Sequence, residues 1–445
     1  MYRKNQVISA LIIICISIAL ISFGTLERFP KRVIIEKLVS QTESYIGIMD
    51  SVKISPDGKG IAYIEQVESK QRVVVDGKAG KLYDSIMDGS PYFSSDSKRV
   101  AYTAQLGDMW TVVMDGIENG WYDGINTIPT FSPNGKRLAF GARIGEKRFV
   151  IVDWQPEKNS FDFLGNILTF SPDSSRLAYT AQLGDDWLVM IDGKPGKRYH
   201  DVPLFIFSPD SRKFAFSARQ GNKYVIVIDG KEGQHYDGIL ESTPIFSPDS
   251  NSLAYVAKRG DWRFVVLNGA EGKPYTGIGK YTLMFSPDSQ HLAYAAQLDG
   301  KWFVVRDGNE GERYDGIGTS FVFSPDSKRE AYTALLGNKW MVVVDGKPGL
   351  PYDGIGIGTP VFSADSKRLA YVALSGKKQL AVVNEKIGKQ YDGIGEYSLT
   401  FSPDNRYLAY AAQRGSKQFI IKNGKEQKNL TLSVRRLFSV RMVKV

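Results

Sequence analysis

Short apolar runs recur along the chain, each bounded by residues that favour turns. Four kinds of run alternate: one that ends at Phe-Ser (residues 244–247), a Leu-Ala-Tyr run (292–296), a β-branched run (340–344) and a Tyr-Asp-Gly-Ile segment (352–355). Period-two alternation and β-branched residues favour strands over helices. The pattern therefore predicts four short strands in each period, with the Tyr-Asp-Gly-Ile segment as the fourth.

The same sequence motif recurs ten times along the chain. A serine within Phe-Ser-Pro-Asp or a close variant recurs in steps of 37 to 39 residues, at Ser55, Ser94, Ser132, Ser171, Ser208, Ser247, Ser286, Ser324, Ser363 and Ser402. Self-similarity at a fixed period of this length is typical of repeat architectures. No linker-like stretch interrupts the series.

Turn-forming residues separate the predicted strands. Proline in Ser-Pro-Asp-Ser presets φ for a type I turn. Asp-Gly, as at Asp345-Gly346, favours a tight hairpin because both positions tolerate positive φ. A second glycine three residues later, such as Gly349, indicates another left-handed position. The third copy has Asp153-Trp154 and a stretched segment 155–160 instead, so we expect a different hairpin there.

A four-stranded unit of about 40 residues, repeated in tandem, predicts β-propeller blades. The string Phe-Ser-Pro-Asp-(Ser/Gly)-Lys-Arg-Leu-Ala-Tyr resembles the TolB-like, WD-repeat-like propeller family over residues 45–424. The repeats begin too early to leave room for the N-terminal α/β domain of TolB, so the resemblance is to the repeats alone. The expected fold is all-β: one propeller of about ten blades, or alternatively two five-bladed rings. Residues 45–48 are expected to complete the last blade beside residues 418–421.

The N-terminus predicts export. Arg3 and Lys4 precede an uncharged apolar stretch, residues 7–26, long enough to span a bilayer as a helix. Residues 1–30 are interpreted as a signal-anchor, with a cleaved signal peptide as the alternative, 31–44 as a linker and 425–445 as a tail. We therefore expect a membrane-anchored propeller outside the cytoplasm, periplasmic or extracellular, or a secreted one after cleavage.

Composition narrows the chemistry. The 57 Lys+Arg against 48 Asp+Glu give a net charge of +9, too modest to indicate nucleic-acid binding by an exported chain. Basic residues beside the Ser-Pro-Asp-Ser turns could attract an anionic envelope polymer. One cysteine and three histidines predict no cysteine-based metal site. The Asp-Gly-Lys turns lack the carboxylate spacing of a calcium loop, so no metal or cofactor is expected.

The candidate binding residues lie at the loop between the second and third strands. Eleven and sixteen residues after the repeated serine, polar and aromatic side chains recur, and binding hot spots favour Trp, Tyr and Arg. The predicted set is Gln105, Trp110, Gln182, Trp187, Arg219, Tyr224, Gln297, Trp302 and Trp340. The competing interpretation is that these aromatic residues pack between blades.

Repetition argues against catalysis, because a catalytic site is one asymmetric constellation while a repeat places the same residue ten times. No catalytic residues are assigned, and the predicted function is a non-catalytic envelope scaffold that binds a protein or polymer. The alternative is a glycan-acting lyase or hydrolase with a site at the central channel. Its candidate departures from the repeat are Phe161, Asp162, His200 and Asp201.

Overall fold

The computed structural model describes residues 51–427, and this part contains no α-helix. Among these residues, no helix is long and apolar enough to cross a membrane. The predicted N-terminal segment, the linker, the closing strand at 45–48 and most of the tail lie outside the described residues. The predicted ring closure and the choice between one ring and two therefore stay predictions.

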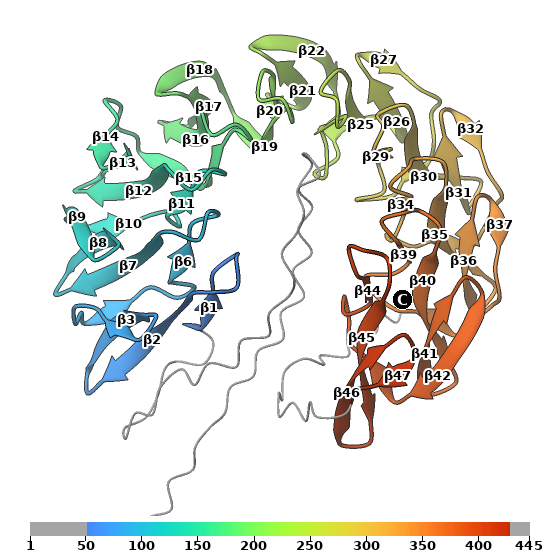
Figure 1. Cartoon of the computed structure of the whole chain (residues 1–445). Helices are drawn as coiled ribbons and strands as arrows, with labels where there is room; N and C mark the ends of the chain where they lie inside the picture. Colours follow the sequence, from blue (N-terminus) through green and yellow to red (C-terminus); the bar gives the residue numbers. More distant parts are fainter. Residues whose placement is uncertain (1–50, 428–445) are drawn as a thin grey trace, which may run out of the picture. The chain divides into compact units, whose positions relative to one another are not determined.

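Ten antiparallel sheets follow one another along the described chain (Figure 1). Each is built from consecutive strands, and the strand order within a sheet is the order along the chain. The chain divides into two compact units. The first comprises the residues up to Val202 together with Asp210–Arg212 and Ala218–Gly221, and the second comprises the remaining residues. The predicted all-β architecture of four-stranded units is confirmed, and the sheets have the strand order of propeller blades.

The second strand is the buried centre of most sheets, and β2 and β45, in the first and last described sheets, are less buried. In most of them the first five residues are consecutively buried, as in Leu369–Ser375, because a neighbouring sheet covers each face. Small Ala residues alternate with Leu and Tyr there, which lets the sheets approach closely. These strands, each seven residues long, are β2 Ile61–Val67, β7 Val100–Leu106, β12 Leu138–Ile144, β16 Leu177–Leu183, β20 Phe214–Gln220, β25 Leu253–Arg259, β30 Leu292–Leu298, β35 Glu330–Leu336, β40 Leu369–Ser375 and β45 Leu408–Arg414.

The third strand forms a tight hairpin with the second. Leu335 faces Trp340 and Ala331 faces Val344, so the hairpin is in register over its whole length. Its β-branched residues face the neighbouring sheets. These strands are β3 Lys70–Val75, β8 Met109–Met114, β13 Lys147–Val152, β17 Asp186–Ile191, β21 Lys223–Ile228, β26 Trp262–Leu267, β31 Lys301–Arg306, β36 Lys339–Val344, β41 Lys378–Val383 and β46 Lys417–Lys422.

The fourth strand follows the Asp-Gly turn. Asp345 and Gly346 have φ of 51° and 74°, which confirms the predicted turn conformation. The Asp345 carboxylate also accepts a 2.9 Å hydrogen bond from the Glu330 N–H at the start of the second strand. The fourth strands are β4 Lys78–Ala79, β9 Ile117–Tyr122, β14 Gln155–Pro156, β18 Lys194–Tyr199, β22 Lys231–Tyr236, β27 Ala270–Glu271, β32 Asn309–Glu310, β37 Lys347–Pro348, β42 Lys386–Tyr391 and β47 Lys425–Glu426.

The second glycine of this turn differs from the prediction. Gly349 does not adopt positive φ, and its N–H donates to the Val342 carbonyl at 2.9 Å. A Cβ on Gly349 would lie only 3.0 Å from that carbonyl oxygen. Glycine is required there because the fourth strand approaches the third so closely, not because of a left-handed backbone.

The Tyr-Asp-Gly-Ile segment serves two sheets, so its assignment as one fourth strand was wrong. Tyr352 pairs with Trp340 in its own sheet, whereas Gly354–Ile355 pairs with β40 of the next sheet. The segment therefore connects the outer edge of one sheet to the first strand of the following sheet. Periodicity predicted an extended segment but could not reveal which neighbours it pairs with.

The first strand is usually interrupted in the middle. At the gap, the Thr359 hydroxyl donates to the Gly356 carbonyl at 2.7 Å and accepts from the Val372 N–H at 3.3 Å, which replaces a lost ladder bond. In contrast, β15 and β19 are continuous. The first strands or their parts are β1 Lys53–Ile54, β5 Ser85–Ile86, β6 Tyr92–Phe93, β10 Gly124–Ile125, β11 Thr130–Phe131, β15 Phe163–Phe170, β19 Asp201–Phe207, β23 Gly238–Ile239, β24 Ile245–Phe246, β28 Gly277–Ile278, β29 Met284–Phe285, β33 Gly316–Ile317, β34 Val322–Phe323, β38 Gly354–Ile355, β39 Val361–Phe362, β43 Gly393–Ile394 and β44 Thr400–Phe401.

Candidate functional site

The repeated Ser-Pro-Asp-Ser motif is a hydrogen-bonded turn. Buried Ser324 donates from Oγ to Asp326 Oδ1 at 2.6 Å and accepts from the Arg329 N–H at 2.9 Å. The Asp326 N–H in turn donates to Ser366 Oγ of the next sheet at 3.0 Å. The hydrogen bond from Ser324 lowers the pKa of Asp326. Since the serine hydroxyl is fully engaged in the turn, the motif supplies architecture and not a nucleophile.

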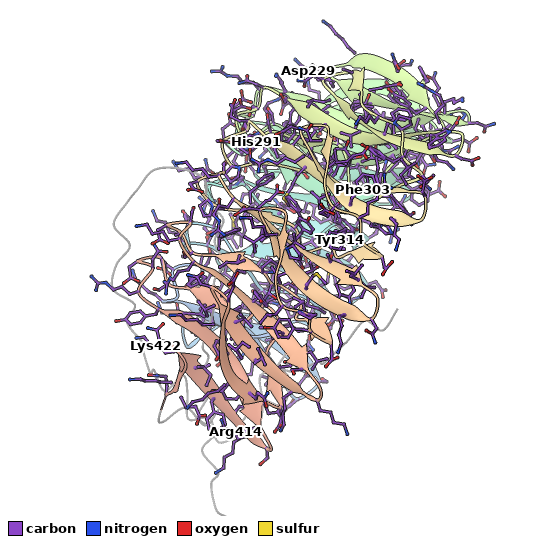
Figure 2. All side chains as sticks on the ribbon, turned by 90° about the vertical axis from the view of Figure 1, so that its right-hand side faces the viewer. Asp229, His291, Phe303, Tyr314, Arg414 and Lys422 are labelled. Atoms are coloured by element: carbon purple, nitrogen blue, oxygen red, sulfur yellow. The ribbon has the colours of Figure 1, made fainter. Side chains whose placement is uncertain are left out.

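A second contact, which recurs in several repeats, lies at the opposite end of the sheets. Asp353, in Tyr-Asp-Gly-Ile, accepts from the Gly376 N–H at 2.7 Å in the next sheet and from Lys339 Nζ at 2.5 Å in its own. The hydrogen bond from Lys339 is the main reason that the pKa of Asp353 is lowered. Because Gly376 lies in the turn between second and third strands, this aspartate holds one such turn against the preceding sheet. The two ends of a hairpin are marked by Arg414 and Lys422 in Figure 2.

The predicted binding residues lie at this second end, and all nine are half-buried. Six of them form three directly opposed cross-strand pairs: Gln105 with Trp110, Gln182 with Trp187 and Gln297 with Trp302. Trp340 faces Leu335 in the same way. The structure thus brings predicted residues together as cross-strand pairs in three sheets.

Two of the tryptophans, Trp302 and Trp340, lie over the first-strand segment of their own sheet. A Cβ on Gly277 would be 3.5 Å from Trp302 Cη2, and one on Gly318 would be 3.5 Å from Trp340 Cζ3. Glycine in the first strand therefore leaves room for the indole. The four tryptophans are half-buried. Half-burial is compatible with packing and with binding, so the role of the aromatic set in binding stays a prediction.

Arg219 and Tyr224 differ from the tryptophan pairs. Arg219 curls back to its own turn, where Nη1 donates to the Gly221 carbonyl at 3.3 Å. Tyr224 pairs with Tyr236 across β21 and β22. Both positions lie at the same second-to-third-strand end as the others.

Apolar side chains at the tips of these turns were missed by the sequence reasoning. Leu106, Ile144 and Leu336 are 36%, 55% and 51% exposed, although each ends a buried strand. We call these three residues the turn-tip set. The available signal was an apolar residue directly before the turn glycine, where a polar residue would be expected in a solvated loop.

The basic residues at the first end divide into two kinds. Arg137, Arg329 and Arg368 lie over Phe170, Phe362 and Phe401 of the following sheet, at 5.1, 5.5 and 4.6 Å from the ring centroids. The preceding lysines, Lys136, Lys328 and Lys367, are exposed. These three arginines therefore stabilise junctions between sheets, whereas the three lysines are exposed to solvent.

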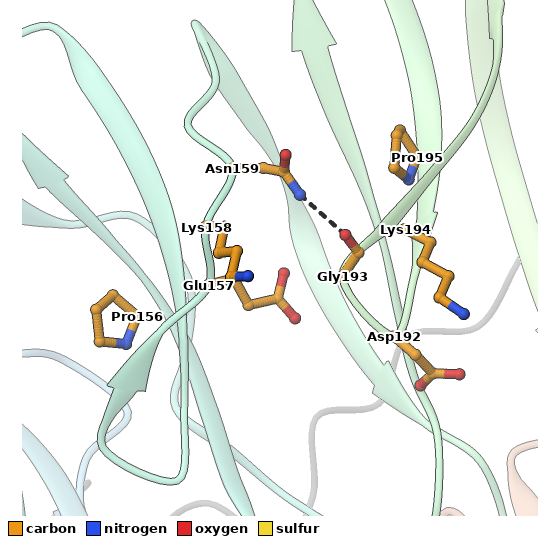
Figure 3. A pocket seen from close by; sticks show the side chains of 8 residues that line it. All are labelled: Pro156, Glu157, Lys158, Asn159, Asp192, Gly193, Lys194 and Pro195. Atoms are coloured by element: carbon orange, nitrogen blue, oxygen red, sulfur yellow. Dashed lines mark hydrogen bonds between the residues drawn. The ribbon is translucent and has the colours of Figure 1, made fainter.

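The third sheet carries the departure that the sequence predicted. Its outer hairpin and the neighbouring turn line a cavity of about 500 Å³ formed by Pro156, Glu157, Lys158, Asn159, Asp192, Gly193, Lys194 and Pro195 (Figure 3). Asn159 Nδ2 donates to the Gly193 carbonyl at 2.9 Å across it. Burial raises the pKa of Glu157, whose carboxylate accepts from the Tyr179 hydroxyl at 2.5 Å.

The other residues that depart from the repeat pattern lie in strands or make contacts with nearby residues. Phe161 is buried and packs edge-on against Tyr179, with ring centroids 6.1 Å apart. Asp162 accepts from Lys147 Nζ at 2.7 Å, and His200 Nδ1 accepts from the Gly221 N–H at 3.1 Å. Asp201 begins the continuous strand β19. Among residues 51–427, no three His, Cys, Asp or Glu side chains gather as a metal-ligand set.

No protein-family model matches the chain, and no curated protein matches it. Membership of the TolB-like family therefore stays a prediction. The solved structures that resemble the chain include a eukaryotic initiation factor, 12% identical, with a TM-score of 0.40, covering 74% of this chain and 96% of that one. TolB from Acinetobacter baumannii is 18% identical, with a TM-score of 0.26, covering 48% of this chain and 62% of that chain.

The Dos1 propeller is a further similar structure, 11% identical, with a TM-score of 0.33, covering 67% of this chain and 93% of that one. Identities this low concern the fold alone. The description of the sheets as propeller blades rests on their strand order and on the period of the repeat.

Proposed function

We propose that this protein is an exported, membrane-anchored β-propeller scaffold that binds another envelope protein through the turns between second and third strands. The carrying observation is the exposure of Leu106, Ile144 and Leu336 at the tips of those turns. Half-buried Gln105 and Trp110 lie directly beside Leu106, and half-buried Trp340 lies beside Leu336, giving apolar contact area together with hydrogen-bonding groups.

Rigid support favours these turns as a binding surface. In most repeats an aspartate of the Tyr-Asp-Gly segment accepts from the turn glycine, as Asp84 does from Gly107 at 2.7 Å and Asp315 does from Gly337 at 2.7 Å. Turns held in this way lose little conformational entropy when a partner docks. An anionic polymer is a second partner class, which the exposed lysines at the other end of the sheets would attract.

The export part of the proposal rests on sequence. Residues 7–26 are uncharged and long enough to span a bilayer, and they follow Arg3 and Lys4. A glycan lyase or hydrolase, the alternative from sequence, needs an acid and a base outside the repeated motif. The recurring Ser and Asp side chains are engaged in turns and junctions and do not supply that pair.

The test is partner capture from solubilised membranes with the full chain. Leu106→Ser, Ile144→Ser and Leu336→Ser are combined in one variant, and Trp110→Ala, Trp187→Ala and Trp302→Ala in another. The matched control is Ile117→Ser with Ile387→Ser, because these residues are 67% and 57% exposed on fourth strands, away from the turns.

We expect the turn-tip variant to lose proteins that wild type and control both retain. Its urea unfolding midpoint should be unchanged, because exposed substitutions alter stability little. Identical captured proteins from wild type, turn-tip variant and tryptophan variant would overturn the proposed surface.

A further inference from the structure

One sheet begins its second strand with a charged residue. The first position of that strand is apolar in nine sheets, occupied by Ile61, Val100, Leu138, Leu177, Phe214, Leu253, Leu292, Leu369 and Leu408. In the eighth sheet it is Glu330, which is only 8% exposed. A carboxylate at a leucine position in a core costs free energy unless it is well paired.

The facing position is also changed. The last residue of the third strand in the preceding sheet normally packs against that apolar residue: Val344 lies with Leu369 in one cluster, and Val383 with Leu408 in another. At the junction between the β28–β32 sheet and the β33–β37 sheet, the corresponding residue is Arg306. An ion pair thus stands where the neighbouring junctions have an aliphatic contact.

The ion pair is loose. Arg306 Nη1 lies 3.5 Å from Glu330 Oε2, while Arg306 Nε lies 3.8 Å from Asp307 Oδ2. Glu330 Oε2 is buried and has no hydrogen-bond partner. Since one guanidinium is shared between two carboxylates, Glu330 is only partly compensated.

The charges around Glu330 are mixed. Asp345 Oδ1 accepts from the Glu330 N–H, and Arg329 pairs with the same carboxylate at 2.9 Å. His291 Nδ1 lies 2.7 Å from Asp307 Oδ2, in the place that arginine takes in the repeats of Arg137 and Arg329.

Burial is the main cause that raises the pKa of Glu330. Arg306 and His291 oppose this rise, while Asp345 and Asp307 add to it. A raised folded-state pKa means that ionisation disfavours the folded junction.

We propose that the Arg306–Glu330 contact makes this junction a pH-dependent opening point, firmest in mild acid and loosest at neutral and alkaline pH. A carboxyl group whose pKa is raised on folding gives its full stabilisation below the unfolded value, near 4.5. That stabilisation is lost as pH rises through the folded value. The junction therefore weakens upward from about pH 4.5, while the apolar junction of Val344 with Leu369 does not.

Hydrogen exchange of the full chain at pH 5 and pH 8, corrected for intrinsic rates, measures this opening. Amides of β31 and β35 should lose protection relative to β36 and β40, by less than about tenfold for each unit by which the Glu330 pKa is raised, because pH 5 already lies above the unfolded value. Glu330→Leu should remove the difference between the junctions. Glu330→Gln keeps the shape and removes the charge, so it should do the same if the leucine variant packs poorly.

Arg306→Val combined with Glu330→Leu recreates the aliphatic contact of the next junction. This double variant should show pH-independent protection at both junctions. Equal pH dependence in wild type and Glu330→Gln, or the same pH dependence at the Val344–Leu369 junction, would overturn the inference.

Discussion

In the outer hairpins of the second and third sheets, a glutamate accepts a hydrogen bond from a tyrosine hydroxyl of a neighbouring sheet, but the pKa of the glutamate is lowered in one hairpin and raised in the other. Glu118 accepts from the Tyr83 hydroxyl of the preceding sheet at 2.8 Å and from Lys81 Nζ at 2.7 Å. Glu157 accepts from Tyr179 of the following sheet, and among the described residues no lysine or arginine lies within ion-pair distance of it. The hydrogen bond from Lys81 lowers the pKa of Glu118, whereas burial raises that of Glu157.

The difference originates in the turn before Glu157. Asp153-Trp154 replaces Asp-Gly, and Trp154 holds a φ of 71°, which is unusual for a large side chain. The Trp154 ring packs edge-on against Phe140, with centroids 6.4 Å apart. The stretched hairpin then brings Glu157 against the next sheet. Departures from the repeat, more than the repeated residues, give individual sheets their own chemistry.

The largest effect should come from Tyr179→Phe, which leaves the half-buried Glu157 carboxylate without its hydroxyl donor. Loss of a donor to such a group costs about 1–3 kcal/mol. The matched variant is Tyr236→Phe in the sixth-sheet pair, where Glu271 keeps Arg259 Nη2 at 2.7 Å and should lose only about 0.5–1.5 kcal/mol. Equal losses in urea unfolding would contradict the contrast between paired and unpaired carboxylates.

Replacing Glu157 or Glu271 by glutamine should change the free energy of unfolding by a smaller amount, and in opposite directions at the two positions. Glu157→Gln keeps an acceptor for Tyr179 and removes a disfavoured charge, so stability at pH 8 should be unchanged or rise by a few tenths of a kcal/mol. Glu271→Gln removes a largely exposed ion pair and should lower stability by about 0.2–1 kcal/mol.

The pH dependence distinguishes the same two carboxylates. Glu157 stabilises the fold most below the ordinary carboxyl pKa, and this contribution falls as pH rises through its raised value. The pKa of Glu271 is lowered by its hydrogen bond with Arg259, so its contribution is present above the ordinary value and is lost as pH falls. Carboxyl carbon shifts followed by NMR titration would show both midpoints. Midpoints displaced in the same direction would refute the contrast.

The sequence predicted much of the local structure because turn residues act over short distances. Asp345-Gly346 takes the predicted positive φ values, and the repeated serines mark ten sheets. The pairing of Tyr352 with one sheet and of Gly354 with the next could not be predicted, because the sequence of an extended segment does not determine which strands it pairs with. The nine candidate residues lie beside the turn between second and third strands, as predicted, whereas the glycines beneath Trp302 and Trp340 could not be assigned to these rings from the sequence. Glu330 was readable as the one charged residue in a column of apolar ones.

The central claim is that Ser-Pro-Asp-Ser is a structural turn. The most direct test is urea unfolding of Ser324→Ala, with exposed Ser416→Ala as control. Ser324→Ala removes the donor to Asp326 and the acceptor of the Arg329 N–H, so we expect a loss of about 1–3 kcal/mol. The control should stay within about 0.5 kcal/mol of wild type. Unchanged stability in Ser324→Ala, accompanied by loss of partner capture, would contradict the structural role and make the serine a functional residue.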